Sequence, residues 1–235
     1  KANHFYSNGS IQYDKSYKEN IEAMLSTFGG VLYESNGVLY LTVDAPDLPV
    51  HHFDESNIIG SVNITTGTKS EYVNTMDSTY TNPENDYSED IIRFPSDAIN
   101  NDTVVKDGYI IKKDLNYKWI QDKTQLATLS NIELLKSKYI HNTITFNTYI
   151  TDMKVFDVFT ISFKEAGFEN NKYRVVSRTV PMTVDKTGII QITAISYDDG
   201  IYQGKDPGRF PQEGLTNLPN PTYVAPPSNL RVQRL

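Results

Sequence analysis

The first part of the chain carries a helical pattern followed by a strand pattern. Over residues 16–28 the apolar positions recur at helical spacing, and Ser16 with Glu19 forms an S-x-x-E capping box. Two glycines end this pattern, and two β-favouring runs follow at 31–33 and 38–43. The Asn-Gly pair between the runs supplies the positive φ angles of a tight hairpin turn. The pattern predicts one amphipathic helix on one hairpin, a small α+β unit.

The next segment, from residue 45 to about 55, contains Pro46 and Pro49. Proline has no N–H to donate to a sheet ladder. We therefore expect a connector here, and a first domain of residues 1–55 that consists of the helix-hairpin unit and this connector.

Residues 56–203 are rich in Thr, Val, Ile and Tyr with strand-like alternation. From Ile140 to Ile150, apolar or β-branched residues alternate with Thr and Asn, which indicates an antiparallel sheet with one solvated side. Asp122 and Gln125 can cap one long helix over 122–138. Seven or eight strands with one inserted helix predict a closed or nearly closed antiparallel β-barrel. The expected strands are 60–66, 71–81, 88–94, 108–115, 140–150, 156–163, 173–180 and 189–197.

Beyond residue 203 the composition changes to a proline-rich segment, residues 204–235, with five prolines between Gly204 and Pro226. Because proline fixes φ and removes a donor, we expect an extended C-terminal tail that acts as a spacer or strap. The fold class expected for the whole chain is mainly β with minor α, that is, α+β.

Composition narrows the classes of protein that fit. A hydrophobic fraction of 38% and a mean hydropathy of −0.45, without an apolar run near 18 residues, predict a globular protein with no transmembrane segment. A net charge of −7 argues against nucleic-acid binding, which needs a basic surplus. The absence of cysteine excludes disulfides and a Cys nucleophile. The chain opens with Lys1 and no leader-like pattern, and we expect it to be a fragment of a longer protein.

The candidates for metal binding are weak. Among the four histidines, His4, His51, His52 and His141, the adjacent His51-His52 pair is the best, but neighbouring side chains of an extended segment point apart. We expect a solvated loop there. The acidic stretch from Asn82 to Asp90 resembles a calcium loop, yet it lacks the Gly at the sixth position and has Arg93 where the bidentate Glu should stand. A hairpin loop is the expected structure.

Catalytic candidates are limited to the carboxylate pairs Asp54-Glu55 and Asp198-Asp199. A glycosidase needs two opposed carboxyl groups, and adjacency in sequence does not provide that geometry. The sequence contains no nucleophile elbow, P-loop or dinucleotide-binding motif. We therefore expect no catalytic, cofactor or metal site, and no enzyme. Sixteen tyrosines and ten phenylalanines leave a sugar-binding platform open as an alternative to strand pairing and core.

Taken in order, several segments resemble the hub region of phage tail-tip attachment proteins, the host-specificity family of long-tailed phages and prophages. The resemblance covers about residues 11–232. The segments that carry it are Asn20 to Leu25 with Gly29-Gly30 and the hairpin, Tyr72-Val73-Asn74, Tyr80 to Tyr87, Asp107-Gly108-Tyr109, Ala194 to Asp198, Ile201-Tyr202, and Ala225 to Val232. The last of these, Ala225 to Val232, resembles the first strand of a truncated fibronectin type III-like module.

This resemblance implies a structural virion protein, the hub of a tail tip or baseplate that joins the tail tube to host-recognition modules. It also implies a homotrimer in the full-length hub, with other tail-tip proteins, the tail tube and the tape-measure protein as partners. The host receptor is reached through modules outside this chain. Localisation would be the virion tail tip, after assembly in the bacterial cytoplasm. The alternatives are a carbohydrate-binding β module and, third, a wall-degrading enzyme. A hub fragment should expose apolar or strand-edge surface.

Overall fold

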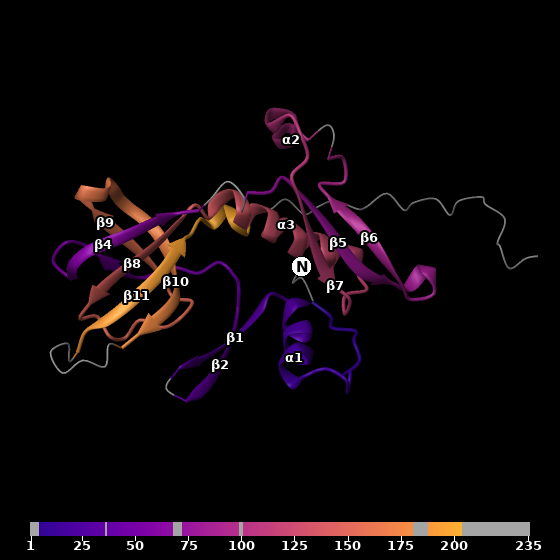
Figure 1. The fold of residues 1–235 in the computed structure, drawn as a ribbon, viewed down its shortest axis with the longest axis horizontal. Helices are drawn as coiled ribbons and strands as arrows, with labels where there is room; N and C mark the ends of the chain where they lie inside the picture. The colour runs from indigo at the N-terminus through magenta and orange to yellow at the C-terminus, as the bar shows by residue number, and fades with distance from the viewer. Residues whose placement is uncertain (1–4, 36, 68–71, 99–100, 181–187, 204–235) are drawn as a thin grey trace, which may run out of the picture.

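The computed structural model describes residues 5–35, 37–67, 72–98, 101–180 and 188–203. Eleven strands and three α-helices are present in these ranges, and the strands form three separate sheets (Figure 1). The α+β class is thus confirmed. The expected proline-rich tail and fibronectin-like strand lie outside the described residues. No helix in the described part of the chain is both long and apolar enough to cross a bilayer.

The helix-hairpin unit forms as the sequence predicts. Helix α1 (Tyr17–Ser26) begins at the predicted capping box: the Ser16 N–H donates to Glu19 Oε2 at 2.8 Å, and the Glu19 N–H donates to Ser16 Oγ at 3.2 Å. Strands β1 (Gly30–Ser35) and β2 (Val38–Val43) pair antiparallel. The positive φ expected at the turn is present at Gly37, at 76°.

The second sheet has six strands in the order β3-β9-β10-β11-β8-β4. Side chains from all six strands meet in one core, which includes Phe146 and Ile192 but neither Ile21 nor Leu25 of α1. The pairing of β3 with β9 is parallel and the other pairings are antiparallel. The strands are β3 (Pro49–Phe53), β4 (Ile58–Thr66), β8 (Asn142–Thr148), β9 (Val158–Phe163), β10 (Phe168–Thr179) and β11 (Ile190–Ser196).

The third sheet has the order β6-β5-β7 and packs on the long helix α3. Tyr80 of β5 packs with Leu126 of α3 in one buried cluster, and the Ser78 and Ser130 hydroxyls bond across the same contact at 2.7 Å. Asp122 caps α3 as predicted, accepting from the Gln125 N–H at 2.8 Å. The elements are β5 (Thr75–Asn82), β6 (Ser88–Phe94), the short helix α2 (Asp102–Asp107), β7 (Lys112–Tyr117) and α3 (Lys123–Tyr139).

The described residues form no closed barrel, which corrects the closed form of the predicted barrel of seven or eight antiparallel strands. Strands β3 and β4 form the two edges of the six-stranded sheet, and although only residues 54–57 separate them, they are not paired with each other. Strands β5, β6 and β7 belong to a different sheet. Alternation of polar and apolar residues identifies strands, but it carries no information about which strands pair, and this is why one barrel was expected.

The connector expected at 45–55 contains strand β3. Pro49 is its first residue and β3 is an edge strand, which are the two positions where a missing N–H is tolerated. Helix α2 was not predicted, and β7 begins at Lys112, four residues later than the expected strand at 108–115. The strand predicted at 88–94 matches β6 at both ends, and the ends of the remaining predicted strands differ from the observed ones by up to five residues.

Candidate functional site

The two histidines of the adjacent pair make separate contacts in the structure. His51 and His52 lie on the edge strand β3 rather than in a solvated loop, so that expectation is corrected. The His52 Nδ1 and Thr160 Oγ1 atoms are 2.8 Å apart, while the His51 ring packs edge-on against Phe53 at 4.6 Å. In the ranges that the structure describes, no three His, Asp or Glu side chains gather in a way that could hold a metal ion.

The acidic stretch from Asn82 to Asp90 is the turn of the β5–β6 hairpin, as predicted. The first candidate oxygen of the stretch, Asn82 Oδ1, stabilises the turn: it accepts from the Glu84 N–H at 3.0 Å and caps a short 3-10 helix. The Asn82 amide also donates to Asp90 Oδ2 at 3.1 Å. The loop therefore holds its own turn together rather than presenting a set of free oxygens.

Both carboxylate pairs also stabilise turns. Asp54 Oδ1 accepts from the Ser56 N–H at 2.8 Å, and Asp198 Oδ1 accepts from the Gly200 N–H at 2.7 Å. Asp199 pairs with Lys172 at 2.5 Å. Asp54 and Asp198 act within their own turns, whereas Asp199 pairs with β10 and Glu55 accepts from the Lys164 N–H at 3.4 Å.

The motif residues Tyr72, Asn74 and Asp107 form a polar cluster at the start of β5. The Tyr72 hydroxyl and the Asn74 amide each donate to Asp107 Oδ2 at 2.8 Å. The same Asn74 amide donates to the Tyr109 carbonyl at 2.9 Å, and Asn74 Oδ1 accepts from the Ile111 N–H at 2.7 Å. Burial, together with the bond to Asp107, raises the pKa of Tyr72 to about 12. The cluster ties the α2–β7 segment to β5, which is a structural role.

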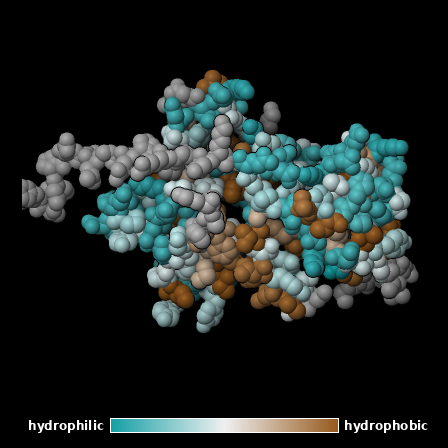
Figure 2. All heavy atoms as spheres, turned by 180° about the vertical axis from the view of Figure 1, so that it is seen from behind, coloured by the Kyte–Doolittle hydropathy of each residue, from teal (hydrophilic) through white to brown (hydrophobic). Residues whose placement is uncertain are grey.

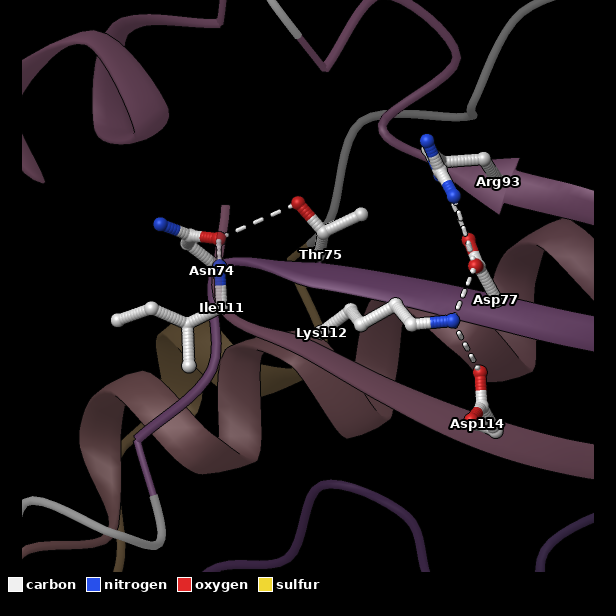
Figure 3. A network of polar contacts seen from close by, with 7 residues as sticks. All are labelled: Asn74, Thr75, Asp77, Arg93, Ile111, Lys112 and Asp114. Carbon is white, nitrogen blue, oxygen red and sulfur yellow. Dashed lines mark hydrogen bonds and ion pairs between the residues drawn. The ribbon is translucent and has the colours of Figure 1, made fainter. Parts of the chain in front are cut away.

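A ladder of charges crosses the face of the three-stranded sheet opposite α3 (Figure 3). Arg93 binds the Asp77 carboxylate with two bonds of 2.7 and 2.8 Å, and Lys112 lies 3.4 Å from Asp77 and 3.3 Å from Asp114. The Arg93 bond and the nearby Lys112 outweigh burial and lower the pKa of Asp77. These cross-strand pairs align β6, β5 and β7 and leave no charge of the ladder unpaired.

A second charge cluster joins the hairpin, α3 and the six-stranded sheet, and we call it the junction: Asp44, Glu133, Lys136, Arg174 and Tyr202. Arg174 of β10 is 5% exposed and pairs with Asp44, which directly follows β2. Arg174 also donates to the Tyr202 hydroxyl and to the Ala45 carbonyl, both at 2.5 Å. Lys136 of α3 pairs with Asp44 at 2.5 Å and with Glu133 at 2.6 Å.

The junction balances its charges. Burial by itself would raise the pKa of Asp44, but Lys136, Tyr202 and Arg174 together hold it below its usual value. Burial likewise opposes the charge on Lys136, yet Glu133 and Asp44 raise its pKa. Two cations face two carboxylates, and the Arg174 guanidinium also lies 4.6 Å from the ring centre of Tyr197. Asp44 and Lys136 are thus held in their charged forms.

Two largely apolar cavities of about 470 and 240 Å³ flank the Asp44–Lys136 pair. The larger one lies between the helix-hairpin unit and α3, and the smaller one lies against the six-stranded sheet. Both contain charged groups that are already paired, and the Tyr202 hydroxyl, which lines both, donates to the Asp44 carboxylate. The arrangement holds the helix-hairpin unit, α3 and the six-stranded sheet in register.

The outer face of the β1–β2 hairpin is exposed and carries four aliphatic side chains, which we call the hairpin face (Leu32, Leu39, Leu41 and Val43), together with Glu34 opposite Leu39. Leu32 lies opposite Leu41 in the register, and Leu39 and Leu41 are 67% and 62% exposed. The opposite side of the hairpin carries Tyr33, which stacks on Tyr40 and is only partly exposed. Figure 2 shows hydrophobic side chains gathered on the lower side of the molecule, where the hairpin lies. This exposed apolar surface is what we expect of an assembly component.

Sequence reasoning missed the junction, whose members are brought together from positions 44, 133, 136, 174 and 202. A partial signal existed, because Tyr197 and Tyr202 belong to the segments that carry the family resemblance. Both rings pack against Arg174. The hairpin itself was predicted, but its alternation could not show which face remains uncovered.

Comparisons with known proteins agree with this structural reading. A family model described as "Putative phage tail protein" matches residues 16–177. The fold is similar to a chain in the virion of a native gene transfer agent particle, with a TM-score of 0.59 and 16% identity, over 82% of this chain and 41% of that chain. It is also similar to the tail protein from Neisseria meningitidis MC58, with a TM-score of 0.55 and 11% identity, over 82% of this chain and 58% of that chain. This chain spans about half the length of these two structures. A search of curated proteins gives no match.

Proposed function

This chain belongs to the family of phage tail proteins, and from that membership we propose that it forms part of the hub of a tail tip or baseplate. The observation that carries the proposal is the family match, which spans the helix-hairpin unit, the third sheet and most of the six-stranded sheet. In this role the chain joins the tail tube to host-recognition modules and assembles as a homotrimer in the complete hub. Its place is the virion tail tip.

The contacts of the described residues support a scaffold rather than an enzyme. Asp54 and Asp198, two of the carboxylates considered as catalytic candidates, are bound within turns, and the buried charges of the junction are paired between the hairpin, α3 and the six-stranded sheet. A scaffold must resist deformation, and a buried network that bonds three units in one place contributes to that. The partners that we propose are other tail-tip and tail-tube proteins and the tape-measure protein, and the receptor is bound through modules outside this chain.

The test is the oligomeric state of a longer polypeptide that contains this chain and the rest of its hub. Light scattering at several concentrations should show a trimer whose population rises with concentration. A longer polypeptide that stays monomeric at about 100 μM, well above the micromolar dissociation constants of weak interfaces, would contradict the hub assignment. The same preparation should not hydrolyse peptidoglycan or polysaccharide, and measurable hydrolysis would favour the wall-degrading alternative.

A further inference from the structure

Residues 5–12 precede α1 and lie across the molecule as a segment without helix or strand, which we call the strap. Each residue of the strap is exposed. Among the described residues, the three hydrophobic core clusters are built without any member of the strap. Its release would therefore leave the cores in place, and a segment with so few buried contacts detaches at a low cost in free energy.

Two side-chain amides hold the backbone of the strap near its two ends. At one end, Gln125 Oε1 accepts from the Tyr6 N–H at 3.0 Å, and Gln125 Nε2 donates to the Tyr6 carbonyl at 2.9 Å. At the other end, Asn20 makes the same pair of bonds with the N–H and the carbonyl of Gln12, both at 3.0 Å. A carboxamide that bonds both backbone groups of one residue recognises the main chain and accepts any residue there except proline, which lacks the N–H.

Between these two amides, the strap passes directly over Trp119. The Asn8 N–H donates to the Trp119 carbonyl at 2.9 Å. A Cβ atom placed on Gly9 would overlap the Cγ, Cδ2 and Cε2 atoms of the indole, far inside the distance at which non-bonded carbon atoms pack. This position of the bound segment therefore accepts glycine and rejects residues with a side chain.

The groove under the strap favours being occupied, but it does not require this particular segment. Gln125 and Asn20 are 6% and 8% exposed, so an empty groove would leave two largely buried amides short of partners. The strap does not fill the space available to it. A polar cavity of about 410 Å³ remains beside it, and its lining includes Ser10 of the strap, Ala23 of α1 and Asn116 of β7.

We propose that Gln125, Trp119 and Asn20 form a binding site for a linear peptide, which the strap occupies in an exchangeable way. The ligand is a segment of a protein chain with a glycine three positions after the residue that Gln125 binds. Because the strap is tethered, its effective concentration at the groove is on the order of millimolar, so a free peptide competes poorly until the strap is released. This site does not depend on the proposed hub function.

The first experiment releases the strap in the full chain and follows intrinsic fluorescence, because Trp119 is the only tryptophan of the sequence. Gly9→Ala should expel the strap and shift the emission of Trp119. Tyr6→Pro should release it by a second route, since it removes the N–H that bonds Gln125. The matched control is Ser10→Thr, which also adds one methyl group but next to the cavity, and its emission should equal that of the wild type. Circular dichroism shows whether each variant is folded.

The second experiment supplies the strap as a separate molecule, a fluorescently labelled synthetic peptide of residues 5–13. Its anisotropy should show saturable binding to the Gly9→Ala and Tyr6→Pro chains at concentrations below about 1 mM. Binding to the wild-type chain should be at least tenfold weaker, because the tethered strap competes. The peptide that carries Ser10→Thr should bind like the unmodified peptide, and the peptide that carries Gly9→Ala should bind at least tenfold more weakly.

Three results would overturn the inference. Wild-type emission in both the Gly9→Ala and Tyr6→Pro chains would mean that these contacts do not hold the strap. A lack of peptide binding to both chains up to about 1 mM would mean that the groove is not a binding site. Equal binding of the Gly9→Ala and unmodified peptides would mean that the indole does not select glycine. The trimer test on the longer polypeptide decides the hub proposal separately from all of these.

Discussion

At the scale of single residues, Arg174 connects more of the molecule than its position on β10 suggests. Its guanidinium binds Asp44, the Tyr202 hydroxyl and the Ala45 carbonyl while it is almost completely buried. We expect Arg174→Met to lower the free energy of unfolding by about 3 kcal/mol, since removal of one partner leaves buried polar groups unpaired. Urea unfolding, followed by circular dichroism, measures this loss.

The matched control is Arg178→Met on the same strand. Arg178 donates one bond, from Nη2 to the Thr151 carbonyl at 3.0 Å, in an exposed setting. Its replacement should cost no more than about 1 kcal/mol, the usual contribution of one hydrogen bond. Equal losses in the two variants would show that the junction is not a special point of attachment.

Asp44 makes the stability of the junction depend on pH. Its pKa is lowered in the folded protein, so the folded state holds its proton less tightly than the unfolded state does. The resulting stabilisation is complete above the unfolded pKa of about 4 and is lost as the pH falls through the lower, folded value. The difference in unfolding free energy between the wild type and Asp44→Asn should therefore be constant above about pH 5 and shrink below about pH 4. Urea unfolding of both proteins at several pH values measures this difference. A difference that stays constant below about pH 4 would contradict the prediction.

Local residue chemistry was predictable where the partners are close in sequence. The bonds between Ser16 and Glu19 and between Asp122 and Gln125 follow from capping rules that act over three residues. Arg174 and Asp44 are separated by 130 residues, and no local rule relates them. The same limit applies to Asp107, whose bonds to Tyr72 and Asn74 come from a segment more than thirty residues away.

At the scale of elements, the Asn74 side chain helps to hold β7, the strand that pairs in parallel with β5. Parallel strands need a crossover, and here the Asn74 side chain holds the end of that crossover through Tyr109 and Ile111. We expect Asn74→Ala to cost about 2 kcal/mol, because the Ile111 N–H and the Tyr109 carbonyl, both in part-buried bonds, lose their partner. Amide hydrogen exchange in β7 should then be about 30-fold faster, as that free energy implies.

Tyr72→Phe provides the control for Asn74→Ala. It removes the single hydroxyl bond to Asp107 and leaves the bonds of Asn74 in place. Its cost should be about 1 kcal/mol, with a smaller change in β7 exchange. If exchange in β7 is unaffected by Asn74→Ala, the cluster does not hold this strand.

The sequence patterns predict which strands form antiparallel hairpins, but they do not predict which strands pair in parallel. The β1–β2 and β5–β6 hairpins were predictable because turn residues between two strand-like runs specify antiparallel neighbours. The parallel pairs β3–β9 and β5–β7 join segments far apart in sequence, and alternation alone cannot indicate them. Strand β3 was also missed because Pro49 argues against a strand unless its edge position is known.

At the scale of the whole molecule, the third sheet with α2 and α3 is inserted between two neighbouring strands of the six-stranded sheet. Strands β4 and β8 pair with each other although residues 67–141 lie between them. The two ends of this segment meet, since the Gly67 N–H donates to the His141 carbonyl at 2.7 Å. The sequence indicated one inserted helix at 122–138, and the structure shows that the helix is the last element of a larger insert. We propose that residues 67–141 form a unit within the expected domain 56–203.

This arrangement leads to a prediction about the insert. Thr66 and Asn142 are cross-strand partners, so replacing residues 67–141 by Asn-Gly would turn β4 and β8 into a hairpin with a favoured two-residue turn. We expect the six-stranded sheet to stay folded, because its core draws on β3, β4 and β8 to β11 and on no residue of the insert. Stability should fall, because Lys136 is lost from the junction. Dispersed NMR signals and a cooperative urea transition would show that the shortened chain is folded.

The matched variant Phe146→Ala, which removes a ring that is 1% exposed in the core of the six-stranded sheet, should lower the free energy of unfolding by about 3 to 5 kcal/mol in both the complete and the shortened chain. A shortened chain without a cooperative transition would mean that the two sheets fold as one unit.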